Sequence, residues 1–255
     1  MANREFYNAL LVVKPTAALA NAAQMALSKA PTVPAVVPSQ LPDAFVLDGN
    51  FPPTPISQVG VGAAMMGQAS GDPEGRLVVR GQVPAEQLDQ AVEQAEGRLF
   101  ADPFVEAMPT TCAGMPAVGA AVDVATLLDC ARLHASGMDG NGVAVAIVDG
   151  GINLAHLGAT PRSLSPNFSR IYSWSAVPTI TTGAASVGHG TMCAYDALIA
   201  APKAILLDYA ALVRTVSPGG PALAGLLSDV VRAFAQLIAT MMVPVGAGGR
   251  PFDSL

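Results

Sequence analysis

Charged side chains are scarce in this sequence, and basic ones are the scarcest. Of its 255 residues 13% are charged and 51% are hydrophobic, and 13 Lys and Arg stand against 19 Asp and Glu, which gives a formal net charge of -6 at pH 7. This composition argues against a disordered chain or a coiled coil and favours an extensively buried fold. Because no cluster of Lys and Arg is present to neutralise phosphates, we expect no nucleic-acid partner.

Cysteine is rare, and the glycine pattern of a phosphate-binding loop is missing. The cysteines Cys112, Cys130 and Cys193 are odd in number and far apart, so neither a disulfide framework nor a CxxC metal pair is indicated. The glycines of residues 140–151 do not form GxGxxG between a strand and a helix. A nucleotide-binding domain therefore has little support.

No segment is typical of a signal peptide or of a membrane span. The N-terminus offers only the short apolar run 9–13 before Lys14, which makes a poor export signal. The most apolar later stretch, 222–245, contains Asp229 and Arg232, both costly at the centre of a bilayer. We expect no membrane span, and the sequence is compatible with a cytoplasmic protein or with one secreted without a recognisable signal peptide.

Proline punctuates the N-terminal part of the chain. From Ala17 to about Pro55 the sequence is rich in Ala, Pro, Val and Gln, and its prolines prevent long regular elements. Residues 1–70 are therefore predicted to form an irregular, Pro/Ala-rich arm.

A small α+β region is expected next, over residues 71–136. Residues 76–80 have the composition of a short strand, and Pro84 suits the first turn of a helix over 85–96. The spacing of apolar residues predicts a further helix over 122–135. This region resembles an accessory or propeptide-like module, and a plain structural subdomain is the alternative.

Residues 137–255 carry the pattern of a doubly wound, mostly parallel α/β sheet. The unbroken apolar run 143–148, ending on Asp149, is typical of a buried parallel strand. A helix over 188–200, a buried strand over 204–209 and a helix over 223–242 follow it. Since ligands bind beyond the carboxyl ends of such strands, the position of Asp149 is typical of a residue in a functional site.

Asp149 and His189 together suggest acid–base chemistry. A nucleophilic serine needs an imidazole to take its proton, and the imidazole needs a carboxylate to fix its tautomer. Gly188 and Gly190, on either side of His189, let the backbone turn tightly and approach a substrate. Alone, an Asp at a strand end is also typical of nucleotide and metal sites, and a His at a helix start can be purely structural. The presence of both favours His189 as a general base.

These two segments resemble a known enzyme family. GNGVAVAIVDGGINLAHL resembles the Asp segment of the subtilisin-like serine peptidases, and GHGTMCA resembles their His segment, in the same order along the chain. The resemblance covers residues 137 to the C-terminus and implies a subtilisin-like fold that hydrolyses peptide or protein substrates. It implies Asp149 as the orienting acid and His189 as the general base. His156 and Thr191, with the two glycines beside the base, take supporting roles.

The sequence departs from the family at three points. Gly150 stands where the family usually has Ser or Thr, and neither the oxyanion-hole Asn nor the Gly-Thr-Ser turn of the nucleophile is found. We therefore expect an N-terminal fragment of a peptidase, inactive as given, or a non-catalytic pseudoprotease or peptide-binding module. Cys193 is expected to be a buried core thiol rather than a nucleophile. Relatives often bind calcium, but no ligand cluster identifies such a site, so no cofactor is expected.

Overall fold

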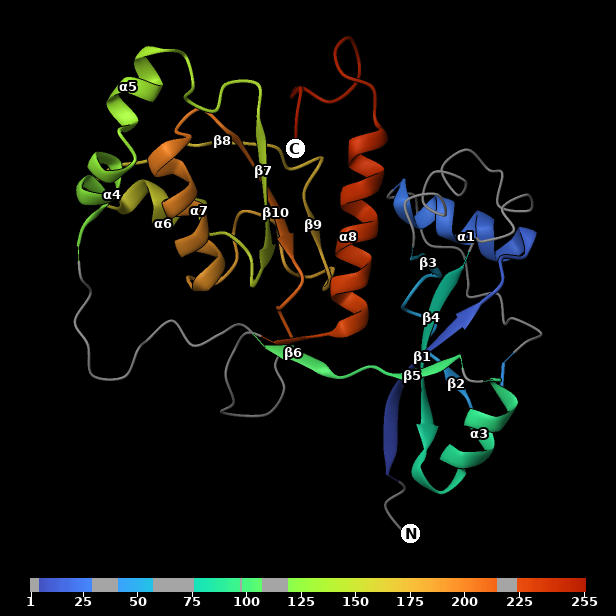
Figure 1. Cartoon of the computed structure of the whole chain (residues 1–255). Coiled ribbons are helices and arrows are strands. Elements are labelled where there is room, and N and C mark those ends of the chain that lie inside the picture. The colour runs from blue at the N-terminus through green and yellow to red at the C-terminus, as the bar shows by residue number, and fades with distance from the viewer. Residues whose placement is uncertain (1–4, 29–40, 57–75, 97, 107–118, 215–223) are drawn as a thin grey trace. The chain divides into compact units, whose positions relative to one another are not determined.

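The chain divides into two compact units of mixed α/β structure. The computed structural model describes residues 5–28, 41–56, 76–96, 98–106, 119–214 and 224–255. One unit comprises Met1–Phe104 and Leu226–Met242, and the other comprises Val105–Gly225 and Val243–Leu255. The first holds an antiparallel sheet and the second a parallel sheet (Figure 1). The α/β class predicted from the sequence is thus confirmed.

The first unit has the element order β1, α1, β2, β3, β4, η1, α3 and β5, and α8 joins it from later in the chain. Its antiparallel sheet has the order β2-β4-β1-β5, and β3 also pairs with β4. The strands are β1 (Phe6–Val13), β2 (Val46–Leu47), β3 (Thr54–Pro55), β4 (Leu77–Pro84) and β5 (Leu99–Ala101). The helices are α1 (Ala17–Leu27), the 3-10 turn η1 (Ala85–Gln87), α3 (Leu88–Gln94) and α8 (Leu227–Met242).

The irregular arm predicted for residues 1–70 is wrong for its first part, because β1 and α1 are regular. In β1 the side chain of Leu11 is buried in the core that α1 and α3 share, whereas Leu10 is buried with Phe51. That alternation is the signature of a strand with both faces covered. Thr16 begins α1, since its hydroxyl accepts the Leu19 N–H at 3.3 Å. The run of prolines starts at Pro31, after this helix has ended, and Pro31 lies outside the described residues.

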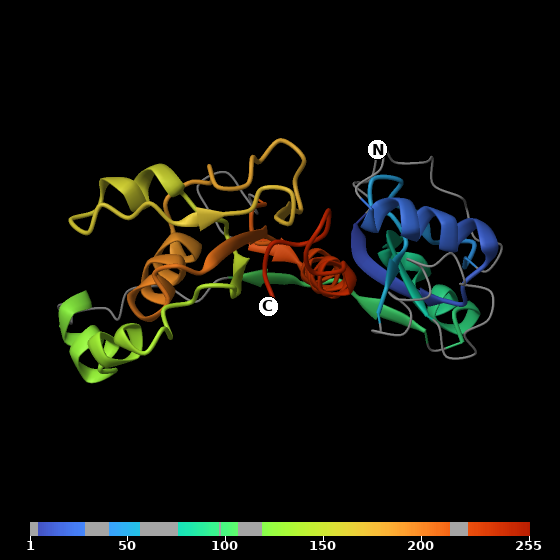
Figure 2. The ribbon, with the colours of Figure 1, turned by 90° about the horizontal axis from the view of Figure 1, so that it is seen from above.

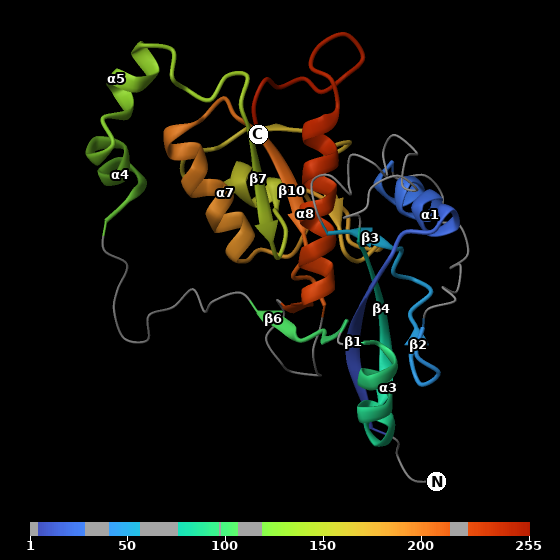
Figure 3. The same cartoon turned by 45° about the vertical axis from the view of Figure 1, so that its right-hand side comes forward.

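Helix α8 belongs to the first unit although it follows the second along the chain. Ala235 and Ala239 are buried in the same core as β1 and α1. The Arg80 guanidinium of β4 contacts the Asp229 carboxylate at 2.9 Å and that of Asp48 at 2.8 Å. Figure 3 shows α8, in red, with β3 and α1 beside it. The compact units therefore do not follow the predicted boundaries 1–70, 71–136 and 137–255.

The second unit is a parallel sheet with helices packed against it. The order is β7-β10-β8, and β9 also pairs with β10. The strands are β7 (Ala144–Asp149), β8 (Asn167–Phe168), β9 (Trp174–Ser175) and β10 (Ile205–Ala210). The helices are α4 (Ala121–Leu127), α5 (Cys130–Ala135), α6 (Leu154–Ala159) and α7 (His189–Ala200). Figure 2 shows α6 on one side of α7 and α4 on the other.

The packing of α7 fixes the frame of the site. Ala194 and Leu198 of α7 are buried against Leu206 of β10 and Leu157 of α6. The strand β7 is less buried than predicted, since the residues between Ala144 and Asp149 are partly exposed. Among the described residues β7 pairs along its length with β10, and its other edge is met by an isolated bridge between Val143 and Ser254.

Two helix predictions need correction. The helix predicted over 122–135 is two short helices, because the backbone at Asp129 turns into the left-handed region with φ at 51°. Leu127, at the end of α4, is 85% exposed, so the apolar stripe read from the sequence is not a buried face. The helix predicted over 223–242 begins at Leu227, since β11 (Ala224–Leu226) precedes it and pairs with β6 (Phe104–Glu106). No helix in the described ranges has the length and apolar character needed to span a membrane.

Candidate functional site

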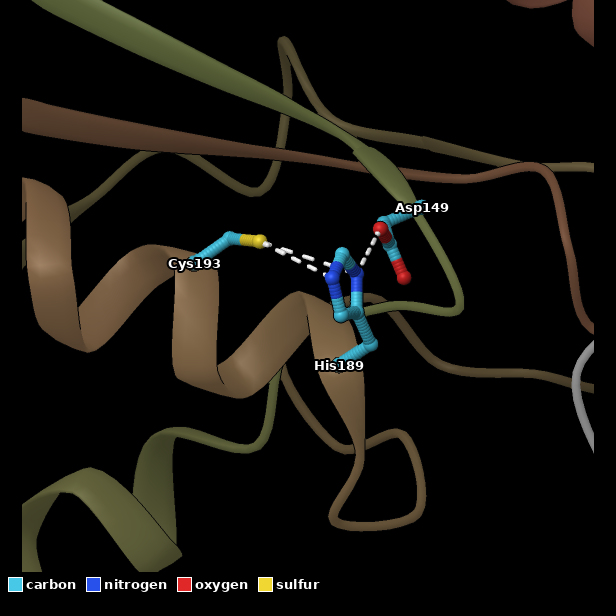
Figure 4. A group of neighbouring side chains, drawn as sticks. All are labelled: Asp149, His189 and Cys193. Carbon is cyan, nitrogen blue, oxygen red and sulfur yellow. Dashed lines mark hydrogen bonds and ion pairs between the residues drawn. The ribbon is translucent and has the colours of Figure 1, made fainter. Parts of the chain in front are cut away.

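Asp149 is the last residue of β7, and the turn that follows it holds its carboxylate. The Gly150 N–H donates to Oδ1 at 2.6 Å. The other oxygen, Oδ2, lies 2.6 Å from Nδ1 of His189, the first residue of α7 (Figure 4). A carboxylate only accepts hydrogen bonds, so Nδ1 carries the proton and donates it. The Asp149 side chain is 11% exposed and that of His189 32%, which leaves the imidazole open to solvent.

Gly190 is required for this approach of α7 to β7. A Cβ atom at Gly190 would lie 2.6 Å from the carbonyl oxygen of Gly151 and 3.2 Å from Cβ of Asp149. Gly151 itself has φ at 92°, in the left-handed region that favours glycine. Gly188 differs from expectation, because its backbone is extended (φ -168°, ψ -158°), a conformation open to any residue. The positive-φ glycine at the site is therefore Gly151, in the turn after Asp149, and the tight turn predicted at Gly188 is not found.

Asn153, which the sequence analysis did not single out, links the two segments. Its N–H donates to Oγ1 of buried Thr191 at 3.0 Å, and its side-chain amide donates to the Ala185 carbonyl at 2.7 Å. Its Oδ1 accepts the N–H of His156 at 2.8 Å, which makes Asn153 the N-cap of α6. An Asn directly before an apolar helical stretch is a capping signal that could have been read from the sequence. Within the described part of the chain, no hydrogen bond joins the His156 imidazole to Asp149 or His189.

Cys193 lies one helical turn after His189 and contacts its ring. Its Sγ is 3.6 Å from Nδ1 and 3.9 Å from Nε2, and the side chain is half-buried (Figure 4). Burial, together with the carboxylates of Asp149 and Asp196, raises the pKa of this thiol. The predicted place in the core is therefore wrong, because the thiol lies against the imidazole. A raised pKa keeps it protonated, which is the opposite of an activated nucleophile.

Asp208, on β10, is a buried carboxyl that the sequence analysis treated only as part of an apolar strand. Its side chain is fully buried, and Oδ2 accepts the Gly183 N–H at 2.8 Å. Oδ1 faces the backbone of Gly151 and Ile152 without a hydrogen bond of good geometry. Burial raises the pKa of Asp208 to about 6. This carboxyl therefore lies against the turn that follows Asp149, and the negative charge of Asp149 also contributes to raising its pKa.

A cavity of about 270 Å³ opens between α6 and α7, and neither Asp149 nor His189 lines it. Apolar groups of Leu157, Val187 and Met192 form much of its wall, with His156 and Tyr195 also lining it. His156 is thus placed at a pocket wall next to α7 rather than in contact with the acid or the base.

The structure brings together the two residues that the sequence paired, Asp149 and His189, and adds Cys193 to them. In the described ranges no Ser or Thr hydroxyl forms a hydrogen bond with either ring nitrogen of His189. Comparison of the chain with known protein families, with curated proteins and with solved structures finds no match.

Proposed function

We propose that this chain carries the acid and the base of a subtilisin-like serine endopeptidase, held on a doubly wound sheet of that family's kind. The observation that carries the proposal is the 2.6 Å contact between Asp149 Oδ2 and His189 Nδ1. The acid ends a parallel strand and the base begins the helix packed beside it, which is where ligands reach an α/β sheet. The order of the two segments along the chain gives independent support.

In this proposal the contact gives each of the two residues a distinct role. Asp149 accepts the Nδ1 proton, which fixes the tautomer and leaves the Nε2 lone pair of His189 free. Nε2 then takes the proton of an attacking hydroxyl and later returns it to the leaving amine, while Asp149 stabilises the imidazolium without itself becoming protonated. The Gly150 N–H on Oδ1 keeps the carboxylate oriented for this task. The substrate class is a peptide or protein.

The nucleophile is the missing component. Cys193 is not a substitute, because its pKa is raised and its sulfur is almost equally far from the two ring nitrogens. A sulfur on the Nε2 lone-pair axis would lie much farther from Nδ1 than from Nε2. The sequence also holds no Gly-Thr-Ser segment. We therefore expect the purified chain to form no acyl-enzyme.

The experiment separates the base from the nucleophile. With the chain in a chelating buffer, hydrolysis of an activated aryl ester is measured across neutral pH, since a positioned imidazole attacks such esters without a serine. We expect His189→Ala to lose most of the rate. Asp149→Asn should lower it strongly, because the neutral amide no longer fixes the tautomer of His189 or stabilises its imidazolium. His156→Ala is the matched control, a second histidine of the same unit, and keeps the rate. Equal rates in the wild type and in His189→Ala would contradict the proposal.

A fluorophosphonate probe tests whether the chain contains an activated serine. This probe labels activated serines, and we expect no labelling of the intact chain. Clear labelling at any serine would show that a nucleophile is present and would overturn our reading of the site.

A peptide-binding module without catalysis is the second candidate. The apolar cavity beside α7 favours it, together with the lack of a hydroxyl on His189 among the described residues. If this candidate holds, a peptide retained by the wild type is retained equally by His189→Ala, whereas Met192→Asp, in the cavity wall, loses it.

A further inference from the structure

Three different metal-binding side chains converge at the end of β7. Oδ2 of Asp149 lies 2.6 Å from Nδ1 of His189, and Nδ1 lies 3.6 Å from Sγ of Cys193. One ligand atom from each residue falls within 4.8 Å of the other two (Figure 4). Carboxylate oxygen, imidazole nitrogen and thiolate sulfur are the three ligand types that zinc takes in proteins.

The distance from Nδ1 to Sγ matches that of a tetrahedral zinc site, and the other distances require the ring of His189 to turn. With bonds of about 2.0–2.1 Å to nitrogen and about 2.3 Å to sulfur, tetrahedral zinc separates its N and S ligands by about 3.6 Å. The distance from Nδ1 to Sγ is 3.6 Å. An oxygen and a nitrogen ligand would be about 3.3 Å apart, against the 2.6 Å found between Oδ2 and Nδ1. Because Sγ also lies 3.9 Å from Nε2, against the face of the ring, the His189 ring has to turn until the Nδ1 lone pair points between Oδ2 and Sγ. This ring lies at the start of α7 and is one-third exposed.

The surroundings suit a cation. The negative charges of Asp149 and Asp196 both act on the Cys193 thiol, and the same field attracts a divalent ion. The Gly150 N–H already occupies Oδ1 of Asp149, so the carboxylate is oriented with Oδ2 toward the ligand position. Nitrogen and sulfur ligands select zinc over calcium or magnesium, which prefer oxygen.

We propose that Asp149, His189 and Cys193 bind one Zn²⁺, which takes the place of the proton between Oδ2 and Nδ1. The thiol of Cys193 gives up its proton to solvent and binds as thiolate, and a water completes the tetrahedron. The imidazole stays neutral, so the proton displaced from Nδ1 is carried by Nε2. One proton is released for each zinc bound.

This tautomer has a consequence that rests on the proposed function. An Nε2 that carries a proton has no lone pair with which to accept another. Zinc therefore switches the base off without covering Nε2, and a chelator switches it on again. The ion acts as a reversible inhibitor of the acid–base pair.

Zinc binding is measured directly, without any turnover. The metal-free chain is titrated with Zn²⁺ against a chromophoric chelator, and with Co²⁺, whose thiolate complex has a near-ultraviolet charge-transfer band. We expect one ion per chain, a thiolate-to-cobalt band, and at least tenfold weaker binding in Cys193→Ala with loss of the band. Cys193→Ser, a smaller change in shape, weakens binding in the same direction. Cys130→Ala, which removes a buried thiol of the same unit, is the control and binds as the wild type does.

Two outcomes would overturn the site: no stoichiometric binding of either ion, or binding that survives in Cys193→Ala and depends on Cys130 or Cys112 instead. Circular dichroism of each variant shows whether it is folded. The ester assay in chelator is read separately, so a chain that binds zinc but shows no His189-dependent rate refutes the proposed function and leaves the site standing. A chain with that rate and without zinc binding refutes the site alone.

Discussion

Asp208→Asn should stabilise the protein at neutral pH, although it removes a buried carboxyl that accepts a hydrogen bond. Burial raises the pKa of Asp208 from 3.8 to about 6 in the folded state. Between these values the folded chain holds a proton that the unfolded chain has lost, so the free energy of unfolding falls as pH rises. Above about pH 6 the carboxyl is ionised in both states, and the folded state bears the full free-energy cost of a buried carboxylate. A pKa difference of roughly two units between the folded and unfolded states corresponds to a cost of about 3 kcal/mol.

The asparagine keeps an oxygen to accept the Gly183 N–H and carries no charge, so it avoids most of this cost. We expect a gain of about 1–3 kcal/mol near pH 7.5 that shrinks to about 1 kcal/mol or less near pH 4.5. Urea unfolding followed by the fluorescence of Trp174 is the assay, because this single, buried tryptophan pairs with β10 beside Asp208 and reports on the same unit.

Asp139→Asn is the matched control, since its pKa moves the other way. The Lys203 ammonium, 2.6 Å away, lowers the pKa of Asp139, so the ion pair stabilises the fold above the unfolded pKa and is lost as pH falls. This variant should destabilise near neutral pH, and the loss should fade in acid. The first variant decides the question. If Asp208→Asn destabilised the second unit, or if its effect did not depend on pH, Asp208 would not be a buried carboxylate that is ionised at neutral pH.

Two further predictions concern packing. Arg80→Ala should lower the free energy of unfolding of the first unit by about 3–5 kcal/mol, because it removes the guanidinium that contacts the buried Asp229 carboxylate at 2.9 Å. A loss under about 1 kcal/mol in urea unfolding followed by circular dichroism would contradict a stabilising role for this ion pair. Gly190→Ala should reduce ester hydrolysis to the level of His189→Ala, because the added Cβ would lie 2.6 Å from the Gly151 carbonyl oxygen and push α7 off the turn after Asp149. A full rate in a folded Gly190→Ala chain would show that this close approach is not needed.

The local elements around the site could be predicted because their signals are local. The apolar run ending on Asp149 became β7, and the glycine-flanked His189 became the start of α7. The spacing of four residues between His189 and Cys193 already places them on one helix face. The spacing could not predict that the Cys193 thiol contacts the His189 ring and is not buried in the core. That contact depends on how α7 packs against β7.

Long-range contacts account for most of what could not be predicted. Asp208 lies in a stretch, ILLDYA, whose apolar pattern reads as a buried strand whether or not its acid points inward. The ion pair between Arg80 and Asp229 joins residues 149 positions apart, and no local pattern announces it. By contrast, β1 and α1 could have been recognised, because the apolar run that ends FYNALLVV and the proline-free stretch 17–27 are visible in the sequence.

The attachment of α8 bears on what a protease could do to this chain. A single cut between Glu106 and Gly119 would divide the chain into two pieces. The N-terminal piece would hold β1 and β4, and the C-terminal piece would hold α8. The two pieces would share one core through Ala235 and Ala239, and one ion pair through Asp229. Nicked protein should therefore elute as one species in native chromatography and separate only in denaturant. Hydrolysis of the connecting segment is not, by itself, release of the N-terminal unit.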